Sequence, residues 1–311
     1  MKSASSQTSD LLIILFLIPP VIPYSFVFVT VEMDSASHAT HGRVVIEVPT
    51  LAAWEDFLFP LLGYHICEMV ESNIPFILGL ENTAAGIPEL KAFGAGFATT
   101  SSAPMFHING ITREAADLDG KVDHLPRVSI NKTDLQTTWG KLNTAADLGT
   151  FVDVVSLGNP HFSLDEFERL VDLTSGRTKR KDAGFIITTN RYVYGEAAKM
   201  GYIDEVERFG AQLITDTCWC MLQEPVIPPK SRTIMANSAK YAHYGPGVSK
   251  RTCHSGSMAA CVDPACTGDR ALSMDPSWLF ETPVRLNLWY LRRTRLNEYN
   301  PMHQLPTICH S

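Results

Sequence analysis

The sequence predicts an α/β fold built on parallel sheets with helices on both faces. Short apolar runs of strand length alternate with longer segments of helical character along most of the chain. Polar turns that contain Gly, Asn, Pro, Asp or Ser directly follow several of these apolar runs. Because sites in parallel sheets form beyond the carboxyl ends of the strands, we expect these turns to meet in one crevice between two subdomains.

Composition sets the broad class. The chain has 311 residues, of which 45% are hydrophobic, enough for a sizeable core and two domains. The net charge of −7 makes nucleic acid an unexpected partner. We expect four parts: an apolar, atypical leader (1–43), a partial first α/β subdomain (44–150), a second α/β subdomain with the main motifs (151–268) and a C-terminal appendage (269–311).

The first subdomain shows the alternation less clearly than the second. Its apolar runs predict strands over 75–80 and 103–108, separated by a helix rich in small residues over 87–99. A capping box, with Thr133 at the N-cap and Gln136 three residues on, predicts that a further helix begins there.

The second subdomain repeats the alternation more regularly. Ser163 and Glu166 form a capping box at the start of one of its helices. We predict strands over 151–157, 184–189, 212–215 and 233–236, and helices over 163–173 and 195–209. Polar turns follow these strands at 158–161, 188–190, 216–218 and 237–240, and all four are expected at the carboxyl edge of one sheet.

Residues 11–31 carry no charged side chain and are long enough to span a bilayer. Pro19, Pro20 and Pro23 would interrupt a helix there, so an unusual or mis-assembled N-terminus is an equal alternative. The seven cysteines are an odd number without a regular framework, which argues against a secreted disulfide scaffold. We therefore expect a cytoplasmic protein, with membrane association through residues 11–31 as the alternative.

The densest chemistry lies over residues 235–247, which stop at a Gly-Pro-Gly sequence. Lys240 would share one helix face with His243 and Tyr244, at i+3 and i+4. Lysine and histidine bind carboxylates, and tyrosine or histidine can move protons, so the segment is typical of a pocket for a small polar substrate. The alternative is a surface helix whose tyrosine rings pack while Lys240 and His243 stay solvated.

Two cysteines are candidate metal ligands. Cys218 follows a strand, and Cys261 is predicted near a helix N-terminus, which would stabilise its thiolate. The chain has no paired Cys-x-x-Cys motif, so a structural zinc site is not expected. Ligands from distant loops, such as these two, can hold an iron–sulfur cluster or a single iron. The alternative is that both are buried apolar cysteines.

His161 lies in the turn that follows the strand predicted over 151–157. A histidine placed there can be a ligand or a proton carrier, or it can cap a neighbouring carbonyl. The chain carries no Gly-rich nucleotide loop, no Gly-x-Ser-x-Gly and no His-Glu-x-x-His. The common nucleotide, serine-hydrolase and zinc-protease signatures are therefore absent from the sequence.

Together these motifs resemble the aconitase X family in order and approximate spacing, over about residues 48–268. The segments that carry the resemblance are 156–163, 216–218, 237–247 and 256–268, with weaker likeness at 60–64 and 106–112. The resemblance implies an aconitase-like fold and an iron-dependent hydro-lyase acting on a small hydroxylated carboxylate. The substrate that the resemblance implies is cis-3-hydroxy-L-proline or a phosphorylated mevalonate, and the motifs are more similar to the hydroxyproline branch.

The resemblance also implies roles for residues and partners. Iron, as an iron–sulfur cluster, is expected on Cys218 and Cys261, and a small swivelling subunit or domain outside this chain is an expected partner. An open iron position would act on the departing hydroxyl. The expected catalytic residues are His161, Lys240 and His243, and the expected substrate-binding residues are Asn159, Asn237, Ser238, Tyr241 and Tyr244.

The chain departs from the family at its start, where a Thr-Cys-x-Pro-Tyr turn and an Ala-Glu-Ser-Asn stretch are missing. This favours a second hypothesis, a catalytically inactive large-subunit remnant that only binds a ligand or partner. A third hypothesis is a cysteine-based enzyme using Cys218 or Cys220, but neither has a histidine partner in the local sequence.

Overall fold

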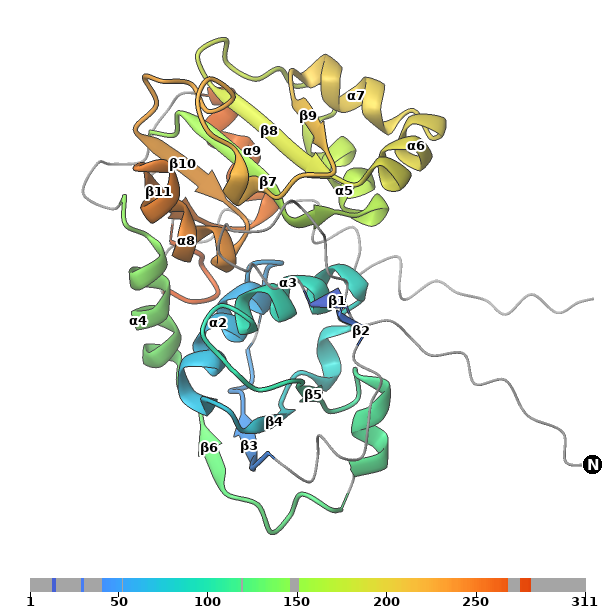
Figure 1. Ribbon diagram of the computed structural model, residues 1–311, viewed down its shortest axis with the longest axis vertical. Coiled ribbons are helices and arrows are strands. Elements are labelled where there is room, and N and C mark those ends of the chain that lie inside the picture. Colours follow the sequence, from blue (N-terminus) through green and yellow to red (C-terminus); the bar gives the residue numbers. More distant parts are fainter. Residues whose placement is uncertain are drawn as a thin grey trace, which may run out of the picture.

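The computed structural model describes residues 13–14, 29–30, 41–51, 53–118, 120–145, 151–267 and 275–280. Two larger sheets organise this part of the chain, one above the other in Figure 1. The four-stranded sheet has the order β5-β4-β3-β6, and the five-stranded sheet has the order β11-β10-β7-β8-β9. Every strand pair in both sheets is parallel, which confirms the predicted α/β class.

The four-stranded lobe alternates strands and helices as predicted. Its strands are β3 (Arg43–Glu47), β4 (Ile74–Leu78), β5 (His107–Ile108) and β6 (Arg127–Ser129). Its helices are α2 (Leu58–Val70), α3 (Ile87–Phe97) and α4 (Lys132–Leu142), with short 3-10 turns η1 (Glu81–Thr83) and η2 (Arg113–Leu118).

The five-stranded lobe follows the same rule. Its strands are β7 (Val154–Phe162), β8 (Gly184–Thr189), β9 (Gln212–Thr215), β10 (Thr233–Ala236) and β11 (Thr252–Ser255). Its helices are α5 (Leu164–Thr174), α6 (Arg191–Lys199), α7 (Tyr202–Phe209), α8 (Ala239–Ser249) and α9 (Met258–Thr267), with the 3-10 turn η4 (Trp219–Met221).

Most differences from the predicted elements have local causes. The strands over 184–189, 212–215 and 233–236 are confirmed, but the strand over 103–108 is limited to His107–Ile108. The single helix over 195–209 is two helices, separated at Gly201 in the left-handed region (φ 79°). The N-cap predicted at Thr133 is wrong. Asn131 caps α4 instead, because its side chain accepts from Asp134 N at 3.0 Å and the Asp134 carboxylate accepts from Asn131 N at 2.8 Å.

Residues on the five-stranded sheet alternate between two apolar clusters. The central cluster lies between the two sheets and includes Phe93, Trp139 and Trp219, and the outer cluster includes Phe167 and Val206. The central cluster takes Val154, Ile186 and Ile234 from the sheet, and the outer cluster takes Val155, Ile187 and Met235. Helices therefore cover both faces, with α8 on the central side and α5, α7 and α9 on the outer side (Figure 1).

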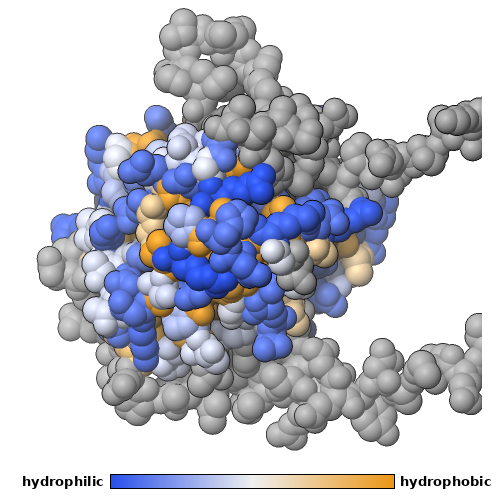
Figure 2. Space-filling model, turned by 90° about the horizontal axis from the view of Figure 1, so that it is seen from below, coloured by the Kyte–Doolittle hydropathy of each residue, from blue (hydrophilic) through white to orange (hydrophobic). Residues whose placement is uncertain are grey.

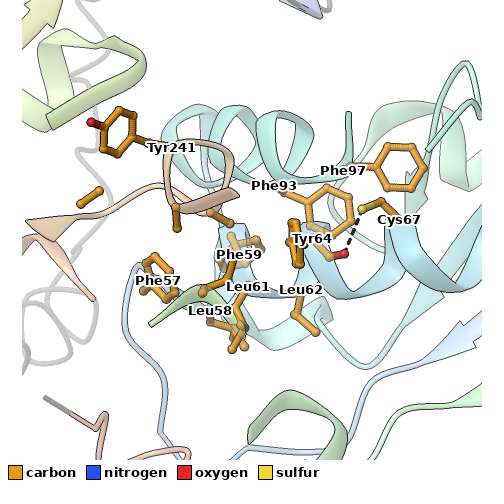
Figure 3. Packing of buried hydrophobic residues seen from close by; sticks show 14 of the residues in the cluster. Phe57, Leu58, Phe59, Leu61, Leu62, Tyr64, Cys67, Phe93, Phe97 and Tyr241 are labelled. Carbon is orange, nitrogen blue, oxygen red and sulfur yellow. Dashed lines mark hydrogen bonds between the residues drawn. The ribbon is translucent and has the colours of Figure 1, made fainter. Parts of the chain in front are cut away.

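Close packing of α2 on α3 forms the middle of the central cluster. A Cβ atom at Gly63 would lie 2.2 Å from Phe93 O, and one at Gly96 would lie 2.6 Å from Pro60 O. Glycine at both positions thus lets the two helices touch through their backbones. Figure 3 shows Phe93 and Phe97 of α3 beside Tyr64 and Cys67 of α2, and the Cys67 thiol donates to Tyr64 O at 2.9 Å. The packing holds α3 against β7, the middle strand of the five-stranded sheet.

The N-terminal prediction lies almost wholly outside the described residues. Of residues 11–31, the structure describes only two strands, β1 (Ile13–Ile14) and β2 (Val29–Thr30), which pair antiparallel. No helix in the described parts of the chain has the length and apolar character needed to cross a bilayer. On the face seen in Figure 2, hydrophilic residues dominate and hydrophobic residues form separate spots.

Candidate active site at the carboxyl edge of the five-stranded sheet

A bulge at the end of β7 builds the first wall of the candidate site. Leu157 pairs with Ile187 and Phe162 pairs with Thr189, so residues 158–161 face a single residue of β8. Gly158 has φ +93°, and a Cβ atom there would lie 2.0 Å from Thr188 O. Only glycine fits this position. The turn predicted at 158–161 is therefore a bulge inside a strand, and it carries Asn159 and His161 out of the ladder.

Asn159 is buried (3% exposed) and holds a cysteine through its amide. Its Nδ2 donates to Cys220 Sγ at 3.1 Å. Its Oδ1 has no hydrogen-bond partner among the described residues. A buried acceptor without a partner is costly, so Asn159 offers a place for a ligand's hydroxyl or ammonium donor.

His161 is half-buried and contacts the segment that follows β9. Its Nε2 lies 2.8 Å from the carbonyl oxygen of Thr217. Because a carbonyl can only accept, Nε2 carries the proton and Nδ1 is the acceptor of the neutral ring. The structure thus fixes one tautomer and leaves Nδ1 as the nitrogen that can take a proton.

Cys218 and Cys220 form a pair at the start of η4, and both are buried. The hydrogen bond from the Cys220 thiol lowers the pKa of Cys218 to about 6, against the opposing effect of burial and helped by the charges of Lys240 and His161. The same hydrogen bond and burial raise the pKa of Cys220. The pair therefore favours the thiolate on Cys218 and the thiol on Cys220.

Lys240 brings positive charge into the same place. It lies in the first turn of α8 and is 6% exposed. Its charge acts on both Cys218 and Cys220. Among the described residues its ammonium has no hydrogen-bond acceptor and no carboxylate partner. Because this ammonium has no carboxylate partner in the described part of the chain, the site is suited to an anionic group such as a substrate carboxylate.

Ser238 and Asn237 lie where β10 leads into α8. Ser238 caps the helix, because its Oγ accepts from Tyr241 N at 3.1 Å. Asn237 borders a small cavity of about 20 Å³, next to Asp56, Glu89 and Arg169. This space holds about one water molecule and is too small for a carboxylic acid substrate. The substrate-binding roles predicted for both residues stay predictions.

The other predicted residues of α8 contact the four-stranded lobe or η4. Tyr241 is 2% exposed and packs edge-on against Trp219, with ring centroids 4.8 Å apart; it lies at the edge of the group drawn in Figure 3. Tyr244 Oη donates to Thr99 O at 2.8 Å. His243 Nδ1 lies 2.9 Å from the Tyr64 hydroxyl on α2, and burial lowers the pKa of its ring. Their predicted roles stay predictions.

Cys261 differs from the sequence expectation. It is fully buried in the outer cluster, and burial raises its pKa well above the ordinary value. Cys218 belongs to the central cluster, on the opposite face of the sheet. The expected thiolate at a helix N-terminus is wrong, because Cys261 N already donates to Ser257 O inside the first turn. The carboxylate of Asp56, not a thiolate, accepts from Met258 N at the start of α9, at 3.0 Å.

Iron is the cofactor that the family resemblance implies for this site. Cys218 is a fitting ligand, since its lowered pKa favours the thiolate. Nowhere in the described ranges do three or more His, Cys, Asp or Glu side chains gather so that they could hold a metal. A complete iron site is therefore not present among these residues.

Two family models match this part of the chain. The Aconitase X second domain matches residues 42–140, and the Aconitase X third domain matches residues 152–267. The chain belongs to the aconitase X family. The first match holds the four-stranded sheet, and the second holds the five-stranded sheet with the Cys218 and Lys240 site.

Two named relatives are similar in sequence to much of this aconitase X chain. It is 50% identical over 232 residues to a cis-3-hydroxy-L-proline dehydratase of Hypocrea jecorina, covering 73% of this chain and 39% of that protein. It is 43% identical to the Pseudomonas aeruginosa protein of the same name, covering 77% of this chain and 41% of the relative. The chain thus spans about two fifths of the length of these relatives.

More distant relatives share the fold. The phosphomevalonate dehydratase large subunit of Methanocaldococcus jannaschii is 26% identical and covers 61% of this chain and 45% of that protein. The crystal structure of Thermococcus kodakaraensis aconitase X, described as a holo-form, aligns with a TM-score of 0.61 and 24% identity. It covers 72% of this chain and 55% of that structure, and it shows the same fold.

Some residues at the site were missed at the sequence level. Thr217 accepts from His161 through its backbone, and a backbone role leaves no mark on residue type. Lys91 on α3 donates to His161 O at 2.6 Å, from a helix seventy residues earlier in the chain. The sequence shows Cys220 beside Cys218, but the hydrogen bond that Cys220 accepts from Asn159 depends on the β7 bulge. Each of these contacts is long-range.

Proposed function

We propose that this chain is the core of a hydro-lyase that removes water from cis-3-hydroxy-L-proline. The printed names of the Hypocrea jecorina and Pseudomonas aeruginosa relatives, at 50% and 43% identity, support this substrate. The observation that carries the proposal is the buried Lys240 side chain, whose ammonium has no carboxylate partner among the described residues and acts on the Cys218 and Cys220 pair. Beside the Cys218 thiolate, a small anionic substrate would supply a carboxylate partner for this ammonium.

The first role is to bind and acidify the substrate. Loss of water takes the proton from the carbon next to the carboxylate and the hydroxyl from the neighbouring carbon, leaving a double bond between them. Lys240 holds the carboxylate and stabilises the negative charge that develops as the proton leaves. Asn159 Oδ1 accepts a hydrogen bond from the substrate's ammonium or hydroxyl and fixes the ring.

The second role is proton transfer to the leaving hydroxyl. The Thr217 carbonyl keeps the proton of His161 on Nε2, so Nδ1 is the atom that gains and gives a proton. Nδ1 of the neutral ring takes the proton that leaves the carbon next to the carboxylate and gives it to the departing oxygen, which leaves as water. His243, which bonds Tyr64 instead, is the second candidate for this step.

Iron, as an iron–sulfur cluster, is the cofactor that we propose from the family resemblance, with Cys218 as a ligand. Its chemistry would be that of a Lewis acid for the leaving oxygen. Because the described residues do not assemble a full ligand set, we derive no step through it. A small swivelling subunit or domain remains the proposed partner, since the more distant relatives are named large subunits.

A chimaera tests the substrate most sharply, because the chain spans only part of its relatives. Residues 42–267 replace the matching segment of the Hypocrea jecorina dehydratase, and loss of one water is followed by mass spectrometry. We expect conversion of cis-3-hydroxy-L-proline and no conversion of phosphorylated mevalonate. The reverse preference would contradict the proposal. A folded chimaera that converts neither substrate would favour the inactive-remnant hypothesis.

A further inference from the structure

The backbone of His161 is held by a lysine from the other lobe. Lys91 lies on α3, and its Nζ donates to His161 O at 2.6 Å. The same ammonium forms an ion pair with Glu166 on α5. The Lys91 and Glu166 side chains are 22% and 11% exposed, so water competes weakly for this contact.

Glu166 extends the contact to Ser163, the residue that joins β7 to α5. Its Oε2 accepts from Ser163 N at 2.7 Å, which is the carboxylate half of the predicted capping box, and also from Ser163 Oγ at 2.8 Å. Lys91 therefore holds the end of β7 twice, by a direct hydrogen bond to His161 O and through Glu166 at Ser163. Residues 158–161 lie outside the regular ladder, so contacts of this kind replace the missing strand pairing.

We propose that Lys91 is a positioning residue for His161. It anchors the His161 backbone so that the ring keeps its hydrogen bond to Thr217 O and presents Nδ1 to the site. The proposal rests on the proposed function, because only a catalytic His161 makes its position matter for turnover. Displacing a reacting group by about 1 Å can cost about 10²-fold in rate, so an anchor outside the site can control catalysis.

The competing explanation is that Lys91 only ties the lobes together. The molecule provides a matched control for it. Arg169 on α5 pairs with Glu89 on α3 at 2.6 Å, joins the same two helices and is buried to a similar degree, with side chains 15% and 4% exposed. No hydrogen bond or ion pair in the described residues joins Arg169 to His161 or Cys218. Loss of either pair weakens the lobe contact, but only Lys91 touches His161.

The experiment compares Lys91→Met, Lys91→Arg and Arg169→Met in the full chain. The first readout is the nitrogen-15 NMR spectrum of labelled histidine, with the His161 signal assigned by its loss in His161→Gln. We expect wild type and Arg169→Met to show the ring protonated at Nε2. Lys91→Met should show a shifted, tautomer-averaged signal. Lys91→Arg should restore the wild-type signal.

The second readout is turnover of cis-3-hydroxy-L-proline. Lys91→Met should lower kcat by about 10- to 100-fold with KM changed less than about threefold, because the residue acts on the proton-transferring group and not on substrate binding. Arg169→Met should leave kcat within about threefold, although both variants lower the Tm by similar amounts.

Two results would overturn the proposal: an unchanged His161 signal in Lys91→Met, or the same shift in Arg169→Met. A shift that Lys91→Met alone produces, without loss of kcat in an active chain, keeps the positioning role and removes His161 from the proposed mechanism. The NMR readout needs no turnover. An inactive chain therefore bears on the proposed function and leaves the positioning test intact.

Discussion

The ring of His161 and the backbone of Thr217 are joined by a hydrogen bond of 2.8 Å. It links the β7 bulge to the residue just before Cys218, across 56 positions of sequence. One contact thus sets the tautomer of the histidine and ties it to the cysteine pair. For the third hypothesis from the sequence, a cysteine enzyme without a local histidine partner, His161 is a histidine whose charge acts on Cys218.

Among the six cysteines that the structure describes, Cys218 should be the most reactive thiol of the metal-free protein. Its pKa of about 6 predicts that alkylation by iodoacetamide, followed by mass spectrometry, rises with a midpoint near that pH. Cys253, whose pKa burial raises to about 12, should stay unlabelled. Lys240→Met removes a nearby positive charge and should move the Cys218 midpoint up by about one unit. A midpoint at the ordinary value of a free thiol in both proteins would rule out this electrostatic account.

Asp56 should make the protein less stable at alkaline pH. Burial raises the pKa of its carboxyl from 3.8 to about 7, offset in part by the hydrogen bond from Met258. The folded pKa lies above the unfolded one, so this group's contribution is full below about pH 4 and is lost as the pH rises through 7. Asp56→Asn keeps an acceptor for Met258 N and removes the titration.

Between about pH 5 and pH 8, the free energy of unfolding of wild type should therefore fall by about 2 kcal/mol more than that of Asp56→Asn. Urea denaturation at each pH measures this. Asp117→Asn, which changes an exposed carboxyl, is the control and should follow wild type. Parallel curves for wild type and Asp56→Asn would show that the carboxyl titrates normally.

Gly158 should be the least replaceable glycine at the site. An alanine there must keep φ near +93° and must displace Thr188 O, so we expect a loss of about 2–4 kcal/mol and of turnover. Gly176 has φ +69° with nothing within 4 Å of its Cβ position. Gly176→Ala should therefore cost only about 1 kcal/mol. Equal losses in the two variants, measured by urea denaturation, would mean that the Thr188 contact is unimportant.

Cys261 and Cys218 should respond differently to substitution. Cys261→Ala leaves a small cavity in the outer cluster and should lower stability by about 1–2 kcal/mol while iron content stays at the wild-type level. Cys218→Ala should reduce iron content. Metal analysis of the purified variants checks both. Loss of iron in Cys261→Ala would instead support the pair of iron ligands, Cys218 and Cys261, that the sequence led us to expect.

The sequence was sufficient for three strands of the five-stranded sheet and for their common edge. The apolar runs at 184–189, 212–215 and 233–236 are strands of one parallel sheet, because buried strands in such sheets carry continuous apolar residues. β11 was missed, since its sequence Thr-Cys-His-Ser has no apolar run. Its residues are nevertheless mostly buried, because α8 and α4 cover them.

The site was predictable only in part, for a geometric reason. Spacing correctly put Asn159, His161, Cys218 and Lys240 at one sheet edge, because parallel strands end together. It could not tell which face of the sheet a cysteine occupies once the chain has left the strand. Cys261 therefore looked equivalent to Cys218, although it packs in the outer cluster. The anchoring by Lys91 depends on how the two lobes meet, which no local pattern encodes.

We expect above all that the ammonium of the buried Lys240 side chain binds the substrate carboxylate beside Cys218. The most direct test is kcat/KM for cis-3-hydroxy-L-proline in the chimaera carrying Lys240→Met. Lys141→Met, which removes an exposed lysine paired with Glu68, is the matched control. We expect Lys240→Met to lower kcat/KM by about 10²-fold or more, and Lys141→Met to change it by less than about twofold. Equal activity in the two variants would contradict the account.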